Sequence, residues 1–219
     1  MAEISTSLLS VKKEEIIKTI YNLETAGTNY FHIDVMDGKF VQDNTNEIMR
    51  EYCEYVTTIS NLPLDVHLMV EDVENYIKSY LIFNPNIITF HYEAIDDKEQ
   101  INYLINFIKE NNCKVGLSIK PETDIAEIYK FLPFIHLVLV MTVEPGKGGQ
   151  SIIPETIEKI SQLSKYINDN NIEVDIEVDG GININNVEQL KKAGANIIVS
   201  GTGIISTDDY KQTIKKMLI

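Results

Sequence analysis

The chain has 219 residues, with 33 acidic and 19 basic side chains and a formal net charge of −14. This charge disfavours nucleic acid and anionic membrane surfaces as partners, so a bound phosphate would have to be held locally by backbone N–H groups or a metal. No apolar run approaches the roughly 18 residues of a membrane span, and the N-terminal residues lack the pattern of a secretory signal.

Length and cysteine content set the next expectations. A chain of this size is typical of one domain, so we expect a single catalytic domain over residues 1–219. Cys53 and Cys113 match no metal-binding or redox spacing. A disulfide between them stays open, but two free thiols in a reducing cytoplasm are the simpler interpretation, and we expect a cytoplasmic protein.

Short β-branched runs alternate with longer segments of helical periodicity along the whole chain. Strands are expected at Ile4–Leu8, Tyr30–Asp34, Leu64–Leu68, Ile87–His91, Lys114–Ile119, Leu137–Met141, Asp175–Asp179 and Asn196–Ser200. Helices are expected at Lys13–Ala26, Asn46–Thr57, Val73–Phe83, Lys98–Asn111, Asp124–Phe131, Pro154–Asp169, Asn185–Ala193 and Asp208–Met217.

Local signals support several of these helix boundaries. Gly27 and Gly194 follow helices, where a left-handed residue is needed. Asp124 and Asp208 are expected as N-caps, and Pro154 suits a first helical turn.

The alternation predicts an α/β fold with a parallel sheet, because parallel strands need helical crossovers. An open doubly wound sheet would have the same alternation. The number of strands, eight, and the lack of a GxGxxG motif after the first strand favour a single (β/α)₈ barrel, the TIM barrel.

Polar side chains gather at the predicted C-terminal ends of the strands, where barrel enzymes carry their active sites. They are Ser7, His32, Asp34, His67, His91, Glu93 and Asp179. Residues two apart share a face of a strand, so His32 points with Asp34, and Asp179 points with Glu177. Asp65 and His67 form another such pair.

Each residue alone is more often a helix cap or a satisfied polar side chain than a ligand. Four imidazole and carboxylate groups at one rim, however, are costly unless they are paired or bind a metal. Two nitrogen and two oxygen ligands suit Zn²⁺, Fe²⁺, Co²⁺ or Mn²⁺ better than Ca²⁺ or Mg²⁺.

Glycine-rich segments follow the last three strands. They are Gly146–Gly149, interrupted by Lys147, then Gly180–Gly181, and Gly201 with Gly203. Glycine lets the backbone approach an oxyanion closely, and phosphate sites near strands 7 and 8 recur in this fold. One such loop would indicate only a tight turn, but three adjacent loops favour a phosphate site.

Several of these segments resemble the ribulose-phosphate 3-epimerase family. The matching runs are FHIDVMDG at 31–38, LDVHLMV at 64–70, FHYEA at 90–94, VMTVEPG at 140–146, GGQ at 148–150, EVDGG at 177–181 and VSG at 199–201. They occur in order from the first strand to the last. The resemblance implies a (β/α)₈ barrel that binds one divalent metal, with Zn²⁺ expected first and Fe²⁺, Mn²⁺ or Co²⁺ as alternatives.

The resemblance also implies roles for individual residues. The metal ligands would be His32, Asp34, His67 and Asp179. Asp34 and Asp179 would also be the two acid–base residues. Substrate contacts would be Ser7, His67, Gly146, Lys147, Gly148, Gly149, Gly180, Gly181, Gly201 and Thr202. The pocket around the reacting carbon would be lined by Met36, Met69 and Met141.

Five residues at four places depart from the family pattern. Gln42-Asp43 stand where Pro-Asn is usual, Lys147 replaces an aromatic residue, Thr202 replaces Ser, and Thr6 replaces Pro in the first strand. None is a metal ligand or an acid–base residue. The first three are expected to border the substrate, so they bear on substrate choice.

The resulting hypothesis is a metal-dependent epimerase that inverts C3 of D-ribulose 5-phosphate to give D-xylulose 5-phosphate. Two aspartates would transfer protons on opposite faces of an enediolate, in the pentose phosphate pathway. D-Allulose 6-phosphate is an alternative substrate, and a non-catalytic sugar-phosphate sensor is a third hypothesis. A tryptophan-pathway type of barrel would share the glycines but would not need His32 and His67. Besides the small-molecule substrate, we expect the chain to associate as a homo-oligomer.

Overall fold

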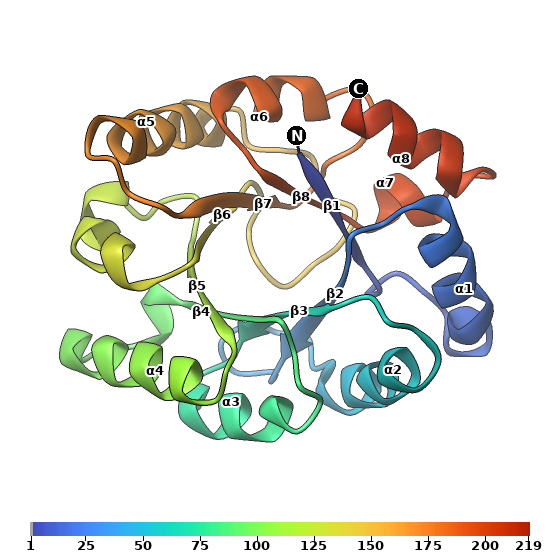
Figure 1. Cartoon of the computed structure of the whole chain (residues 1–219), viewed down its shortest axis with the longest axis horizontal. Helices are drawn as coiled ribbons and strands as arrows, with labels where there is room; N and C mark the ends of the chain where they lie inside the picture. Colours follow the sequence, from blue (N-terminus) through green and yellow to red (C-terminus); the bar gives the residue numbers. More distant parts are fainter. Residues whose placement is uncertain (1) are drawn as a thin grey trace.

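The computed structural model describes residues 2–219, and its eight parallel strands close into a barrel in chain order. This confirms the (β/α)₈ fold and excludes the open sheet. Figure 1 looks into the ring of strands, with the helices around it. The strands are β1 Glu3–Ser7, β2 Tyr30–Met36, β3 Leu64–Met69, β4 Ile87–His91, β5 Lys114–Ile119, β6 Leu137–Met141, β7 Asp175–Asp179 and β8 Ile197–Ser200.

The helices follow the strands as the periodicity predicts, with two differences described below. The α-helices are α1 Ile16–Ala26, α2 Asn46–Ile59, α3 Val73–Leu81, α4 Lys98–Glu110, α5 Glu155–Asp169, α6 Val187–Ala193, α7 Thr202–Ile205 and α8 Tyr210–Leu218. Three segments are 3₁₀ helices: η1 Lys13–Glu15, η2 Tyr92–Ala94 and η3 Ile125–Phe134.

The main core lies between the strands and the helices. In β2, Ile33 and Val35 join this core, while His32 and Asp34 alternate with them and face the inside of the barrel. Each helix contributes one apolar face, as α4 does with the buried Ile101, Leu104, Ile105 and Ile108. The strand alternation therefore leaves the barrel interior available for polar groups.

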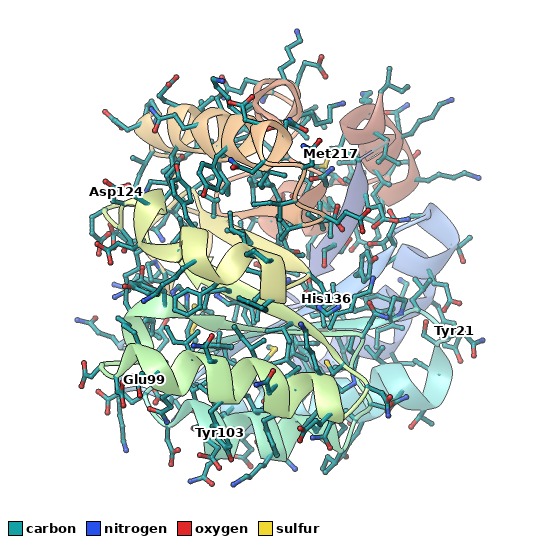
Figure 2. The ribbon with its side chains drawn as sticks, turned by 60° about the vertical axis from the view of Figure 1, so that its left-hand side comes forward. Tyr21, Glu99, Tyr103, Asp124, His136 and Met217 are labelled. Atoms are coloured by element: carbon teal, nitrogen blue, oxygen red, sulfur yellow. The ribbon has the colours of Figure 1, made fainter. Side chains whose placement is uncertain are left out.

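Of the two glycines and two aspartates expected at helix ends, three take the expected role, and Pro154 directly precedes α5 with a helical φ of −58°. Gly27 and Gly194 adopt left-handed conformations after α1 and α6, with φ of 95° and 118°. Asp124, which Figure 2 shows at the edge of the molecule, caps η3 by accepting the Ala126 N–H at 2.9 Å. The cap of α8 is Asp209 rather than Asp208, and it accepts the N–H of Gln212.

Two predictions of helical structure need correction. The segment expected as a helix at 124–131 is η3, a 3₁₀ helix that runs to Phe134 and contains Pro133. Proline has no N–H and cannot continue an α-helical ladder, so apolar periodicity alone misassigned the helix type. The short helix α7 was not predicted, because four residues are too few to show a helical period.

Two further observations bear on the sequence-based expectations. Cys53 and Cys113 are both free and buried in the part of the chain that is described. In residues 2–219, no helix combines the length and the apolar character that crossing a bilayer requires.

Candidate metal centre and phosphate pocket

The register of β2 and β3 brings the predicted ligands together. His32 pairs with Asp65, and two residues further on, Asp34 pairs with His67. All four side chains are buried. Because neighbouring parallel strands run in step, each imidazole stands beside a carboxylate at the same level of the barrel.

One small region inside the barrel receives ligand atoms from three strands. His32 Nε2 and His67 Nδ1 lie 3.3 and 3.4 Å from the same oxygen, Oδ1 of Asp34. Asp179, at the end of β7, places Oδ2 at 3.9 and 3.7 Å from these two nitrogens. The four ligand atoms all lie within 4.8 Å of one another. The structure therefore brings all four predicted metal ligands to one point.

The two nitrogens that face this point are unsatisfied. Among residues 2–219, His32 Nε2 and His67 Nδ1 are buried and have no hydrogen-bond partner. Buried polar atoms without partners are unfavourable, and once His32 has lost its proton a cation between the two nitrogens would satisfy both of them. The donor set of two imidazoles and two carboxylates also fits a divalent transition metal. The residues present therefore fit a metal ion.

The other polar atoms of two ligands are held by neighbours. His32 Nδ1 lies 2.6 Å from Oδ2 of Asp65, which also accepts a hydrogen bond from the Ser5 hydroxyl at 2.7 Å. Asp34 accepts a hydrogen bond from the Ser7 hydroxyl on Oδ2 at 2.6 Å. These contacts leave His32 Nε2 and Asp34 Oδ1 directed at the metal position.

His67 is held by a longer chain of contacts. Its Nε2 lies 2.9 Å from Nε2 of His91, whose Nδ1 lies 3.1 Å from Oε2 of Glu93. The other oxygen of Glu93 accepts the N–H of Lys120 at 2.8 Å and the hydroxyl of Thr123. The sequence placed His91 and Glu93 at the rim but gave them no role, because the groups that hold Glu93, Lys120 and Thr123, lie in the segment after β5.

Electrostatics separate the two aspartates. Burial raises the pKa of Asp34, but the neighbouring His32 and then His67 outweigh it and hold that pKa well below its usual range. Burial and the charge of Asp34 raise the pKa of Asp179 to about 7. Without a metal, Asp34 is ionised near neutral pH and Asp179 carries a proton for part of the time.

The pKa values of the two candidate ligand histidines also shift in opposite directions. Burial opposes protonation of His32, but the charges of Asp65 and Asp34 outweigh it and raise its pKa well above the usual value. Burial lowers the pKa of His67, and it lowers the pKa of His91 to about 4. His136, the fourth histidine, precedes β6 and so lies at the opposite end of that strand from the site (Figure 2).

A cavity of about 60 Å³ lies next to the two aspartates. Its lining includes Ser7, Asp34, Met36, Met69, Met141, Gly146, Lys147, Gly148, Gly149, Asp179, Gly180, Gly181, Gly201 and Thr202. Among the predicted substrate contacts only His67 does not line it. Ser10 and Val143 line it and were missed, because neither has a glycine neighbour or a strand-end position.

The positions that depart from the family pattern separate into two groups. Lys147 and Thr202 line the cavity, whereas Gln42 and Asp43 do not. Both Gln42 and Asp43 are exposed in the loop after β2. The expectation that Gln42 and Asp43 border the substrate is therefore not met. The cavity lining departs from the family pattern at Lys147 and Thr202.

The glycine side of the cavity is shaped by close backbone approaches. Gly181 has φ of +68°, and a Cβ there would lie 2.5 Å from the carbonyl oxygen of Gln150. A Cβ at Gly146 would lie 2.8 Å from Cβ of Val41. Figure 1 shows the segment between β6 and α5 lying across the barrel opening, behind the strands in this view. The loops after β2, β6 and β7 therefore meet over the site through glycine backbone.

Comparison with known proteins agrees with this geometry. The model of the ribulose-phosphate 3 epimerase family matches residues 3–205. The chain belongs to that family. Ribulose-phosphate 3-epimerase of Escherichia coli (strain K12) is 34% identical over 216 residues, covering 98% of this chain and 93% of the relative. The protein of that name from Methanocaldococcus jannaschii is 36% identical over 217 residues, covering 99% and 90%. Family membership identifies the chain as an epimerase.

Solved structures with low sequence identity share the fold. A 3-hexulose-6-phosphate synthase has a TM-score of 0.69 at 14% identity, with 98% of this chain and 97% of that chain covered. KGPDC from Streptococcus mutans has a TM-score of 0.74 at 9% identity, with 100% and 96% covered. At these identities the likeness shows the barrel and carries no conclusion about chemistry.

Proposed function

We propose that this epimerase interconverts D-ribulose 5-phosphate and D-xylulose 5-phosphate and uses one divalent metal, Zn²⁺ in the first instance. The observation that carries the proposal is the pair of unsatisfied nitrogens on His32 and His67 between the carboxylates of Asp34 and Asp179. Epimerisation next to a ketone needs two groups that handle a proton on opposite faces of one carbon. Asp34 and Asp179 stand on β2 and β7, which β1 and β8 separate in the ring.

The metal would be held by His32, Asp34, His67 and Asp179. When bound, it would supply positive charge that stabilises the negative charge formed as the carbon-bound proton leaves. Fe²⁺, Mn²⁺ and Co²⁺ have compatible ligand preferences. Nε2 of His32 has to lose its proton before it can bind a metal.

We assign the two proton transfers to the two aspartates, in the order that their pKa difference in the metal-free protein favours. Ionised Asp34 would take the C3 proton, and the electron pair of the C–H bond would move into the enediolate. Protonated Asp179 would then give its proton to the opposite face of C3, which inverts the configuration. After one turnover Asp34 is protonated and Asp179 ionised, which is the arrangement that the reverse reaction needs.

The phosphate would lie against the glycine side of the cavity, at Gly146–Gly149, Gly180, Gly181, Gly201 and Thr202. Lys147, in the loop after β6, lines the same cavity and would add one positive charge. Met36, Met69 and Met141 supply an apolar lining near the aspartates. Backbone donors and one lysine suit an acidic protein that must hold an anion locally.

The test is a comparison of kcat/KM for D-ribulose 5-phosphate and D-allulose 6-phosphate, measured in parallel on metal-analysed protein. A clear preference for the pentulose supports the proposal. A clear preference for the hexulose would keep the mechanism and change the substrate, and Lys147 and Thr202 give this alternative its structural basis. Metal-loaded protein that turns over neither compound would favour a sugar-phosphate sensor.

Three broader proposals accompany this function. We propose that residues 1–219 act as one catalytic domain, that the enzyme works in the cytoplasm, and that it forms a homo-oligomer. Light scattering coupled to size-exclusion chromatography measures the last of these directly.

A further inference from the structure

We propose that His91 and Glu93 are positioning residues that fix which ring nitrogen of His67 carries its proton, and thereby keep Nδ1 of His67 free to bind the metal. This inference rests on the metal centre of the proposed function. It assigns a role to a buried histidine and a half-buried glutamate that touch neither the cavity nor the metal position.

The donor-to-acceptor direction of the hydrogen-bond chain from Glu93 through His91 to His67 is set at Glu93. The backbone N–H of Lys120 can only donate, so Oε1 of Glu93 must accept at 2.8 Å. The hydroxyl of Thr123 contacts the same oxygen. The second oxygen, Oε2, belongs to an ionised carboxylate and can also only accept. The 3.1 Å contact with His91 therefore requires a proton on Nδ1 of His91.

The direction then passes to His67. His91 is fully buried, which favours the neutral imidazole with a single N–H. With its proton on Nδ1, Nε2 of His91 has only a lone pair. The 2.9 Å contact between the two Nε2 atoms then requires that His67 donates. A neutral His67 that is protonated on Nε2 has a free lone pair on Nδ1, the atom that faces Asp34.

Packing keeps water away from this chain. The ring of Phe40 lies against His91 with centroids 4.9 Å apart, and Nζ of Lys120 lies 4.4 Å from the centre of the Phe40 ring. The rings of His67 and His91 are 5.0 Å apart and tilted by 32°. Water is therefore a poor substitute for either imidazole, and the positions of their protons depend on the neighbouring protein groups.

His32 provides an internal comparison. Its Nδ1 contacts Asp65 directly, and its Nε2 faces the metal position. The two ligand histidines thus use opposite nitrogens, and in each case the contact made by the other nitrogen explains the choice. For His67 the carboxylate acts through a second imidazole, which can carry a hydrogen-bond chain in either direction. Glu93 sets that direction.

One arrangement competes with this one. In the metal-free protein, Nδ1 of His67 could carry the proton and donate to Asp34 Oδ1, 3.4 Å away. His91 would then have to donate from Nε2, which would leave its Nδ1 without a proton opposite the carboxylate of Glu93. His91 and Glu93 would then present lone pairs to each other at 3.1 Å. With Nδ1 of His67 free, the facing lone pairs are those of His67 and Asp34 at the longer distance of 3.4 Å, so this arrangement is favoured.

The decisive variant is Glu93→Gln, which keeps the shape of the side chain. The new amide has one oxygen, and the Lys120 N–H requires it, so the NH₂ group faces Nδ1 of His91. This reverses the chain and puts the His67 proton on Nδ1, where it blocks the metal. We expect Zn²⁺ to bind about 10–100-fold more weakly, the usual effect of losing an outer contact of a metal ligand. The dissociation constant is measured by competition with a chelator.

The matched control is Glu127→Gln, which removes the same charge from a nearby exposed carboxylate that accepts a hydrogen bond from Tyr92. It should bind Zn²⁺ like the wild type. Thermal unfolding of the metal-free proteins separates positioning from a structural role. A structural role would lower the Tm of metal-free Glu93→Gln and leave zinc affinity of the folded protein unchanged, which would overturn the inference. Wild-type affinity in Glu93→Gln would also overturn it.

Nuclear magnetic resonance tests the wild-type protein directly. In ¹⁵N-labelled metal-free protein, long-range couplings identify the protonated nitrogen of each neutral imidazole. We expect the proton on Nδ1 of His91 and on Nε2 of His67, and a proton on Nδ1 of His67 would overturn the inference. Wild-type protein that binds no divalent metal would overturn the proposed metal centre and this inference together. Equal binding of the metal by the wild type and by Glu93→Gln would overturn the inference alone.

Discussion

The two sides of the barrel mouth differ in the groups that they present: one presents buried side chains, and the other presents backbone at glycines. The proposed metal side consists of buried side chains, such as His32, Asp34 and His67, whose other polar atoms are held by neighbours. The proposed phosphate side consists of backbone at glycines, such as Gly146 and Gly181, where a side chain would collide with the neighbouring loop. Metal binding and proton transfer need specific atoms, whereas an anion needs space and N–H groups. Mutations on the two sides should therefore affect different kinetic constants.

The largest effects should come from the metal side. Asp34→Asn and Asp179→Asn each remove one of the two groups proposed to move the proton, and we expect kcat to fall by at least about 10²–10⁴-fold. The fall in kcat should be larger than the loss of acid–base catalysis alone would cause, because both side chains are also proposed metal ligands. Single-turnover assays with each epimer as substrate measure it. Near-wild-type turnover in either variant would refute the two-base mechanism.

Removal of the metal should have a comparable effect. Treatment with a strong chelator is expected to abolish turnover, because the proposed positive charge beside the reacting carbon is lost. Zn²⁺, Fe²⁺, Mn²⁺ or Co²⁺ should restore turnover, because each can bind again to the two buried nitrogens, which have no other partner among the described residues. The far-ultraviolet circular dichroism of the metal-free protein should stay that of a folded barrel. Full activity in protein shown to be metal-free would exclude a required metal.

Metal affinity should rise with pH. Asp65 and Asp34 raise the pKa of His32 above its usual value, so in metal-free protein at neutral pH this imidazole carries a proton that the metal must displace. Below the raised pKa, the apparent affinity for Zn²⁺ should increase about tenfold per pH unit for the proton released from His32, and more steeply below about pH 7 if Asp179, whose pKa is raised to about 7, also releases its proton to bind the metal. Competition titrations between about pH 6 and 8 measure the slope. A flat profile would mean that His32 is already neutral.

The sequence predicted the two sides unequally. The metal side followed from strand alternation, because His32 and Asp34 are two residues apart in a run whose other residues are apolar. Alternation predicted that these side chains point into the barrel, and the family resemblance selected the four proposed ligands from among the strand-end groups. The glycines of the phosphate side were also recognised, but the contact of Val41 with Gly146 joins two loops that are distant in the chain. No local pattern could predict that contact.

The remaining errors have similar causes. The role of Glu93 depends on Lys120 and Thr123, which lie beyond the next strand. The helix cap moved from Asp208 to Asp209 because adjacent aspartates satisfy the same local rule, and only the backbone conformation distinguishes them. Periodicity thus predicted the fold and the strand-end groups. Contacts between loops and the choice between equivalent neighbours required the structure.

A smaller effect is expected on the phosphate side. In Gly181→Ala, the new Cβ would lie 2.5 Å from the Gln150 carbonyl oxygen at a φ of +68°, so the loop must shift away from the phosphate position. We expect KM to rise about tenfold with a smaller change in kcat, which corresponds to about 1.4 kcal/mol of binding free energy. Zinc content should remain that of the wild type. A fall in kcat with an unchanged KM would place Gly181 on the chemical side of the site instead.

The smallest effect should come from Lys147→Ala. Lys147 is exposed at the edge of the cavity, so water and salt screen its attraction to a phosphate, and an exposed ion pair contributes roughly 0.2–1 kcal/mol. We expect KM to rise by at most about fivefold at low salt and hardly at all at high salt, with kcat unchanged. The matched control is Lys130→Ala, which removes an exposed lysine that does not line the cavity. If Lys147→Ala instead changed the ratio of kcat/KM between the pentulose and the hexulose phosphate, this lysine would read the length of the sugar as well as its charge, and the glycine side of the mouth would then depend on a side chain for specificity.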